Sequence, residues 1–245
     1  MEKALSIRRQ LYGNEHEEIA ISYSNIGTLF NDADNINKAL ESYVKAMSIR
    51  KKLYNGDTIQ HSIATLYNNM GRLYRLKKDF DRALDCYKHV LDIKHALLPG
   101  NFHRSIARCH NNIAVTYIDK KDSDTSLRHL QKALEISDSI YGRRHELTAI
   151  ILFNMGNSYI ENKAFPEATK AFSQALDVFT TLEKINNFSQ QYSINQTKCC
   201  IGIGESYYKM GDYLKAKEFY RKAKDFDYKK QYTDRINKKL QIIQN

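Results

Sequence analysis

Tryptophan is absent from this chain of 245 residues, proline occurs only twice and glycine ten times. So few chain breakers argue against a hairpin-rich all-β fold and against a collagen-like chain, and they favour long helices. Hydrophobic residues nevertheless make up 42% of the sequence, too large a share for a disordered protein. The composition therefore predicts a folded protein built mainly from helices.

Long apolar segments and a cysteine framework are also lacking. The longest purely apolar run is Ala149–Phe153, whereas a helix that spans a bilayer needs about 20 residues. The first residues contain no apolar stretch of the secretory type, so we expect a cytoplasmic protein. The few cysteines are irregularly spaced and fit neither a disulfide framework nor a zinc knuckle. We therefore expect Cys86, Cys109, Cys199 and Cys200 to be reduced and mostly buried.

Small residues recur along the chain at a nearly constant spacing. They are 44, 43, 42 and 48 positions apart, at Gly27, Gly71, Ala114, Gly156 and Gly204. Another small residue follows each of them by 12 positions, at Ala39, Ala83, Ser126, Ala168 and Ala216. Four residues further on stands a large apolar side chain, at Tyr43, Tyr87, Leu130, Phe172 and Tyr220. Five matches at fixed offsets indicate an internal repeat.

Helix packing explains these offsets. Two antiparallel helices approach closely where each presents a small side chain, and a bulky residue one turn away fills the neighbouring space. Each repeat is therefore expected to be a helix hairpin that buries its apolar face by stacking on the next. We predict an all-α fold, a stack of helix hairpins that forms a single domain over residues 1–245.

The repeat also predicts where the parts of this domain begin and end. A half-repeat at 1–12 opens the chain, which suggests a piece of a longer protein. Five hairpins follow at 17–54, 60–97, 103–140, 145–182 and 192–228, and a capping helix follows at 231–244. An enlarged loop at 183–191 accounts for the spacing of 48. Glycines between the hairpins, where a left-handed residue ends a helix, are Gly13, Gly56, Gly100 and Gly142.

The core of the first helix in each hairpin is similar to that of a known family. The segments that show this similarity are Tyr23-Ser24-Asn25-Ile26-Gly27, Tyr67-Asn68-Asn69-Met70-Gly71 and His110-Asn111-Asn112-Ile113-Ala114. These segments resemble tetratricopeptide repeats (TPRs), most closely the long repeats of kinesin light chains. The resemblance implies a right-handed α-α superhelix whose concave surface, a groove for a partner, is lined by the first helix of each hairpin.

Histidines at the start of three hairpins raise the question of a metal site. His16 and His145 begin sequences like the H-E-x-x-H helix of zinc proteases, but an alanine stands where the second histidine is required. Stacked helices lie about 8–10 Å apart, whereas zinc ligands converge within about 2 Å of one ion. We therefore interpret His16, His103 and His145 as capping or packing residues. The sequence predicts no enzyme activity and no cofactor or metal.

Asparagine recurs at one position of the first helix in four consecutive hairpins, at Asn25, Asn69, Asn112 and Asn154. A side-chain amide donates and accepts at once, which suits the backbone of an extended peptide. Hydrogen bonding to the neighbouring helix is an equal alternative. The other residues that we expect in the groove are Ser24, Asn68, Asn111 and Asn157, together with the arginines Arg72, Arg75 and Arg108.

The main functional prediction is thus a non-enzymatic scaffold that binds an acidic peptide segment of a partner protein. Two alternatives stay open. From Lys209 onward there are eleven Lys and Arg against five Asp and Glu, so this tail could bind RNA or another polyanion. A charged helix face is usually only solvated, which makes nucleic acid the weaker alternative. Self-association through the apolar edge of the half-repeat is the other alternative.

Overall fold

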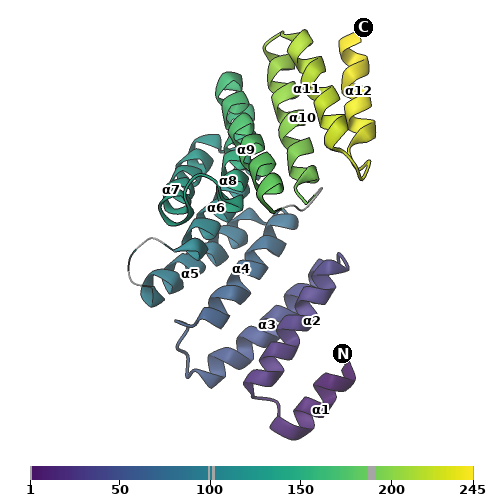
Figure 1. Ribbon diagram of the computed structural model, residues 1–245. Helices are drawn as coiled ribbons and strands as arrows, with labels where there is room; N and C mark the ends of the chain where they lie inside the picture. The colour runs from purple at the N-terminus through teal and green to yellow at the C-terminus, as the bar shows by residue number, and fades with distance from the viewer. Residues whose placement is uncertain (1, 99, 101–102, 187–190, 245) are drawn as a thin grey trace. The chain divides into compact units, whose positions relative to one another are not determined.

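The computed structural model describes residues 2–98, 100, 103–186 and 191–244, and these form twelve helices and no strand (Figure 1). The predicted all-α fold is confirmed. The helices are α1 (Glu2–Tyr12), α2 (Glu17–Asp32), α3 (Ile36–Leu53), α4 (His61–Leu76), α5 (Phe80–Leu97), α6 (Arg104–Asp119), α7 (Ser123–Tyr141), α8 (Glu146–Glu161), α9 (Phe165–Asn186), α10 (Ser193–Lys209), α11 (Tyr213–Phe226) and α12 (Thr233–Gln244).

The chain divides into two compact units, Met1–Asn101 and Phe102–Asn245. In the first unit α2 packs on α3 and α4 packs on α5, and α1 lies against α2. In the second unit the hairpins are α6 with α7, α8 with α9 and α10 with α11, and α12 lies against α11. Each unit therefore consists of helix hairpins and one additional terminal helix. That residues 1–245 form a single domain stays a prediction.

The predicted pairs of small and large residues hold each hairpin together. An ideal Cβ atom added to Gly71 would lie 2.8 Å from Cε1 of Tyr87, which is closer than real Cβ contacts allow. Corresponding clashes would occur between Gly27 and Tyr43, between Gly156 and Phe172, and between Gly204 and Tyr220. These aromatic side chains are at most 2% exposed. The rings therefore lie directly on the backbone of the partner helix.

The ends of the helices follow from local hydrogen bonds. The glycines that were predicted to be left-handed have φ angles of 75°, 82°, 81° and 69° at Gly13, Gly56, Gly100 and Gly142. At the start of α2, α6 and α8, a histidine Nδ1 atom accepts the N–H of the residue two positions on, at 3.1 Å in each case. The interpretation of His16, His103 and His145 as capping residues is confirmed.

Several boundaries differ from the predicted ones, and α11 ends at Phe226 rather than at 228. Helix α9 continues to Asn186 instead of ending at 182, and residues 187–190 of the predicted loop lie outside the described residues. Near the end of the chain, the buried carboxylate of Asp227 accepts the N–H groups of Gln231 and Tyr232, both at 2.9 Å, and the hydroxyl of Thr233 at 2.8 Å. This turn starts α12 at Thr233 rather than at 231.

Candidate functional site: two pockets along α6 and α8

Of the pockets in the second unit, two follow α6 and α8, one towards the beginning of these helices and one towards their ends. The first, here called the arginine pocket, has a volume of about 480 Å³ and is lined by Arg104, Arg108, Asn111, Asn112, Tyr141, His145, Glu146, Leu147 and Ile150. The second, here called the phenylalanine pocket, has a volume of about 580 Å³ and is lined by Val115, Ile118, Asp119, Phe153, Asn154, Asn157, Ile160, Glu161, Phe172, Lys198, Ile201, Gly202, Glu205, Tyr232 and Arg235.

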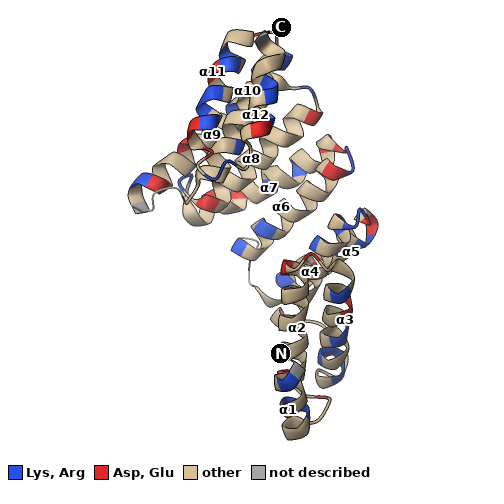
Figure 2. Cartoon of the chain, turned by 90° about the vertical axis from the view of Figure 1, so that its right-hand side faces the viewer, with Lys and Arg blue, Asp and Glu red and all other residues tan. Residues whose placement is uncertain are grey.

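The positive charge of the arginine pocket comes from two arginines in the first turns of α6. Figure 2 draws Lys and Arg in blue. Arg104 and Arg108 are one helical turn apart, and both are exposed. Among the described residues, neither forms an ion pair or a hydrogen bond with another side chain. The two guanidinium groups are therefore available to a ligand, and each offers a planar set of N–H donors.

The opposite wall of the arginine pocket is held in place by the cap of α8. The Nδ1 atom of His145 accepts the N–H of Leu147, and the imidazole stacks on Tyr141 with ring centroids 3.8 Å apart and planes 8° apart. A neutral ring whose Nδ1 atom is an acceptor carries its proton on Nε2. His145 is consequently a fixed donor. Glu146, next to it, gives the pocket its only acidic lining residue among those described.

A hydrogen bond between two asparagines separates the pockets. Asn154 in α8 donates from Nδ2 to Oδ1 of Asn111 in α6 over 2.8 Å, and Asn111 is buried. Asn111 lines the arginine pocket and Asn154 lines the phenylalanine pocket. Of the two interpretations of the asparagine series, hydrogen bonding to the neighbouring helix is thus the one observed for Asn154.

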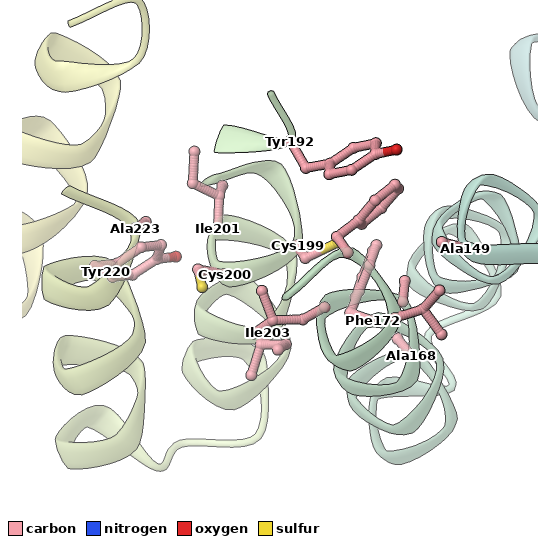
Figure 3. Packing of buried hydrophobic residues seen from close by; sticks show 14 of the residues in the cluster. Ala149, Ala168, Phe172, Tyr192, Cys199, Cys200, Ile201, Ile203, Tyr220 and Ala223 are labelled. Carbon is pink, nitrogen blue, oxygen red and sulfur yellow. The ribbon is translucent and has the colours of Figure 1, made fainter. Parts of the chain in front are cut away.

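The phenylalanine pocket lies where the asparagine series ends. In the fifth hairpin Gly202 occupies the position that asparagine holds in the other four. An ideal Cβ atom on Gly202 would lie 2.6 Å from the ring of Phe172, and one on Gly156 would lie equally close. Phe172 also packs on Phe153, with ring centroids 5.5 Å apart. The floor is therefore apolar and continuous with the buried cluster of α8–α11 (Figure 3).

Charged groups at the rim of the phenylalanine pocket are largely paired. Glu161 lies 2.8 Å from Nζ of Lys121, and Glu205 lies 3.4 Å from Nζ of Lys239 and 3.8 Å from Arg235. Lys198 lies over the ring of Tyr232, with 5.9 Å between Nζ and the ring centroid. Because these charges offset one another, the pocket offers mainly its apolar floor.

The predicted groove residues fall into two groups. All five in the second unit line a pocket: Arg108, Asn111 and Asn112 the arginine pocket, and Asn154 and Asn157 the phenylalanine pocket. The six in the first unit lie on α2 and α4, where Asn25 and Arg72 are exposed and Ser24, Asn68, Asn69 and Arg75 are half-buried. Their part in a groove stays a prediction.

Sequence reasoning missed four residues that shape the pockets: Arg104, His145, Phe172 and Gly202. Two of them carried a usable signal. Arg104 precedes the predicted Arg108 by one helical turn, and Gly202 interrupts the asparagine series. Phe172 was interpreted only as a packing residue and His145 only as a capping or packing residue. Their contacts with Gly202 and Tyr141 join neighbouring hairpins, which the repeat pattern does not specify.

The cysteines offer no reactive centre. All four are free and buried, and burial raises the pKa of the Cys86, Cys109 and Cys200 thiols to about 12. Burial also raises the pKa of the Cys199 thiol. Thiolates are the nucleophilic form, so these side chains pack as small apolar groups.

The described residues contain neither a group of metal ligands nor a helix suited to a membrane. Across residues 2–98, 100, 103–186 and 191–244, no three His, Cys, Asp or Glu side chains are grouped so that they could hold a metal ion. Within the same ranges, no helix combines the length and the apolar character that crossing a membrane requires.

The hairpin architecture and the paired small and large residues define a helical repeat protein. The tetratricopeptide repeat family matches residues 1–52, 62–124 and 105–181, and a second description of the same repeat matches 197–230. These matches cover most of the sequence, and the chain belongs to the tetratricopeptide repeat family.

Solved structures with a similar fold support this assignment. BtubC (BKLC) from P. vanneervenii is 20% identical, with 92% of this chain and 87% of that chain covered and a TM-score of 0.74. TPR-like repeats from Podosopora anserina, named after a kinesin light chain, are 15% identical, cover 89% and 99% of the two chains and have a TM-score of 0.68.

A Rap protein in complex with competence and sporulation factor is 22% identical, with 83% of this chain and 52% of that chain covered and a TM-score of 0.65. At such identities the likeness of these structures concerns the fold alone. Curated proteins give no match.

Proposed function

We propose that this chain is a non-enzymatic interaction module that binds an extended, acidic segment of a partner protein along α6 and α8. One observation carries the proposal: a cationic pocket and an apolar pocket follow one another along the same two helices. An acidic side chain of the ligand fits the first pocket, and a bulky apolar side chain fits the second. Binding by a fold neighbour is consistent with this, since the Rap structure contains competence and sporulation factor.

The apolar pocket supports a peptide ligand more than a polyanion. Nucleic acids present phosphates at regular intervals, and their affinity depends on uninterrupted positive charge. Here Arg104 and Arg108 lie on one side of the Asn111–Asn154 hydrogen bond. On the other side the cations Lys198 and Arg235 share the rim with Glu161 and Glu205, and the floor includes phenylalanine and isoleucine side chains. In the basic tail, Lys215 is paired with Asp212, and Glu205 neutralises part of the charge of Arg235 and Lys239.

Selection from a display library of random peptides tests this function. We expect enriched sequences to contain Asp or Glu followed by a large apolar residue. Arg108→Glu should weaken the enriched peptides about tenfold or more, since it reverses a charge beside the ligand. Val115→Asp should weaken them through the phenylalanine pocket.

Matched controls separate binding from folding. Val44→Asp places the same substitution on an exposed position of α3, where Val44 is 49% exposed, and Arg221→Glu reverses a charge on an exposed position of α11. Both controls should leave peptide affinity unchanged. Arg72→Glu tests the predicted contribution of the first unit separately. If no peptide is enriched, or if the controls lower the affinity as much as the pocket variants, the proposal fails.

A further inference from the structure

The arginine pocket contains more hydrogen-bond donors than a carboxylate ligand uses. Arg104 and Arg108 each present a guanidinium group without a partner among the described residues. A carboxylate has two oxygens and is satisfied by a single guanidinium in a bidentate pair. A second guanidinium one turn away therefore points to an anion with more oxygens and more charge.

The far wall of the pocket adds donors whose positions are fixed. His145 uses Nδ1 as an acceptor for the N–H of Leu147, so its neutral ring donates from Nε2. The stacked ring of Tyr141 holds the imidazole in place, and its own hydroxyl group is a further donor. Donors on two sides of a hollow of about 480 Å³ suit a tetrahedral group better than a planar one.

We propose that the arginine pocket binds the phosphoryl group of a phosphorylated serine or threonine in the partner segment. This proposal rests on the function proposed above and specifies the anion. A phosphoserine carries a charge of about −1.5 to −2 at neutral pH and three strong acceptor oxygens. Arg104 and Arg108 bind these oxygens from α6, and His145 donates to the same group from the start of α8.

Glu146 places one negative charge beside the two arginines. Its carboxylate lines the same pocket, and none of the described cations forms an ion pair with it. It repels a dianion more strongly than a single carboxylate, but the attraction of Arg104 and Arg108 grows by the same factor, and their two charges outweigh its one. The pocket therefore favours phosphoserine over glutamate, and removal of the charge of Glu146 should strengthen binding of either.

The test compares three sets of synthetic peptides that share degenerate flanks and differ in one central residue: phosphoserine, glutamate or serine. We expect the intact chain to bind the phosphoserine set at least about tenfold more tightly than the glutamate set in fluorescence anisotropy. Arg104→Gln and Arg108→Gln should each remove this preference, and Glu146→Gln should increase the affinity. Opposite effects of charge removal within one pocket cannot come from a general loss of folding.

Other results would overturn the proposal in distinguishable ways. Equal affinity for the phosphoserine and glutamate sets would refute the phosphoryl ligand and leave the acidic peptide in place. Failure of all three sets to bind would remove both. A separate titration with inorganic phosphate distinguishes the source: if free phosphate binds as tightly as the phosphoserine peptides, the ligand is not a protein segment.

Discussion

At the scale of single residues, each hairpin depends on how much room the first helix leaves for one large side chain. Four hairpins pair glycine with an aromatic ring, and the third pairs Ala114 with Leu130. Where the small residue carries a methyl group, the large residue is a leucine, which is smaller than the aromatic side chains of the other hairpins. The two positions therefore vary together, because they share one fixed space in the core.

This relation predicts the outcome of a double-mutant cycle in the first unit. Gly71→Ala should lower the free energy of unfolding by about 1–3 kcal/mol, since the new Cβ would lie 2.8 Å from the ring of Tyr87. In a Tyr87→Leu background, which mimics the third hairpin, the same substitution should cost much less. Urea unfolding of the four proteins measures the coupling. An equal cost in both backgrounds would contradict the packing described here.

At the scale of helices, one contact between α6 and α7 predicts that the second unit loses stability in acid. Nδ1 of His110 lies 3.0 Å from Nδ1 of His129, so one ring donates and the other accepts. Burial lowers the pKa of His129 below its ordinary value of 6.5, and the nearby charges of Lys132 and Arg128 lower it further. Protonation of His129 is therefore less favourable in the folded chain than in the unfolded chain.

The direction of the pH effect follows from this lowered pKa. Above about pH 6.5 both states are neutral at His129 and its full contribution to stability is present. As the pH falls through 6.5 towards the folded-state pKa, the unfolded chain binds the proton first and stability is lost. Between about pH 8 and about pH 5.5, we expect the urea midpoint of unfolding to fall less in the His129→Gln variant than in the natural chain. Equal losses would exclude the histidine pair as the cause.

The sequence predicts the contacts within one hairpin, but it does not predict the contacts between hairpins. Spacing of small and large residues predicted the hairpins, because that spacing is imposed within one hairpin. The Asn111–Asn154 bond and the position of Phe172 against Gly202 join different hairpins, and no single repeat specifies them. The late start of α12 depends on the buried carboxylate of Asp227, which a count of apolar positions does not detect.

At the scale of the whole molecule, net charge and exposed apolar side chains act in opposite directions. The formal charge is +10, which repels a second copy at low ionic strength. Helix α1 exposes Ile7 and Leu11, at 54% and 70%. We expect a mass near 28.5 kDa by light scattering in dilute buffer, with larger species at high salt that Leu11→Lys abolishes. A mass independent of both salt and this substitution would exclude self-association through α1.

Phe172 is part of the fourth hairpin, but its ring contacts two hairpins, since it lies against both Gly156 in α8 and Gly202 in α10. Helix α10 cannot separate from α8 and α9 without uncovering that ring to water. Amide protons of α8, α9 and α10 should consequently exchange with solvent in one concerted opening rather than helix by helix. A ligand seated above the ring would slow that opening and so protect amides well away from its own contacts.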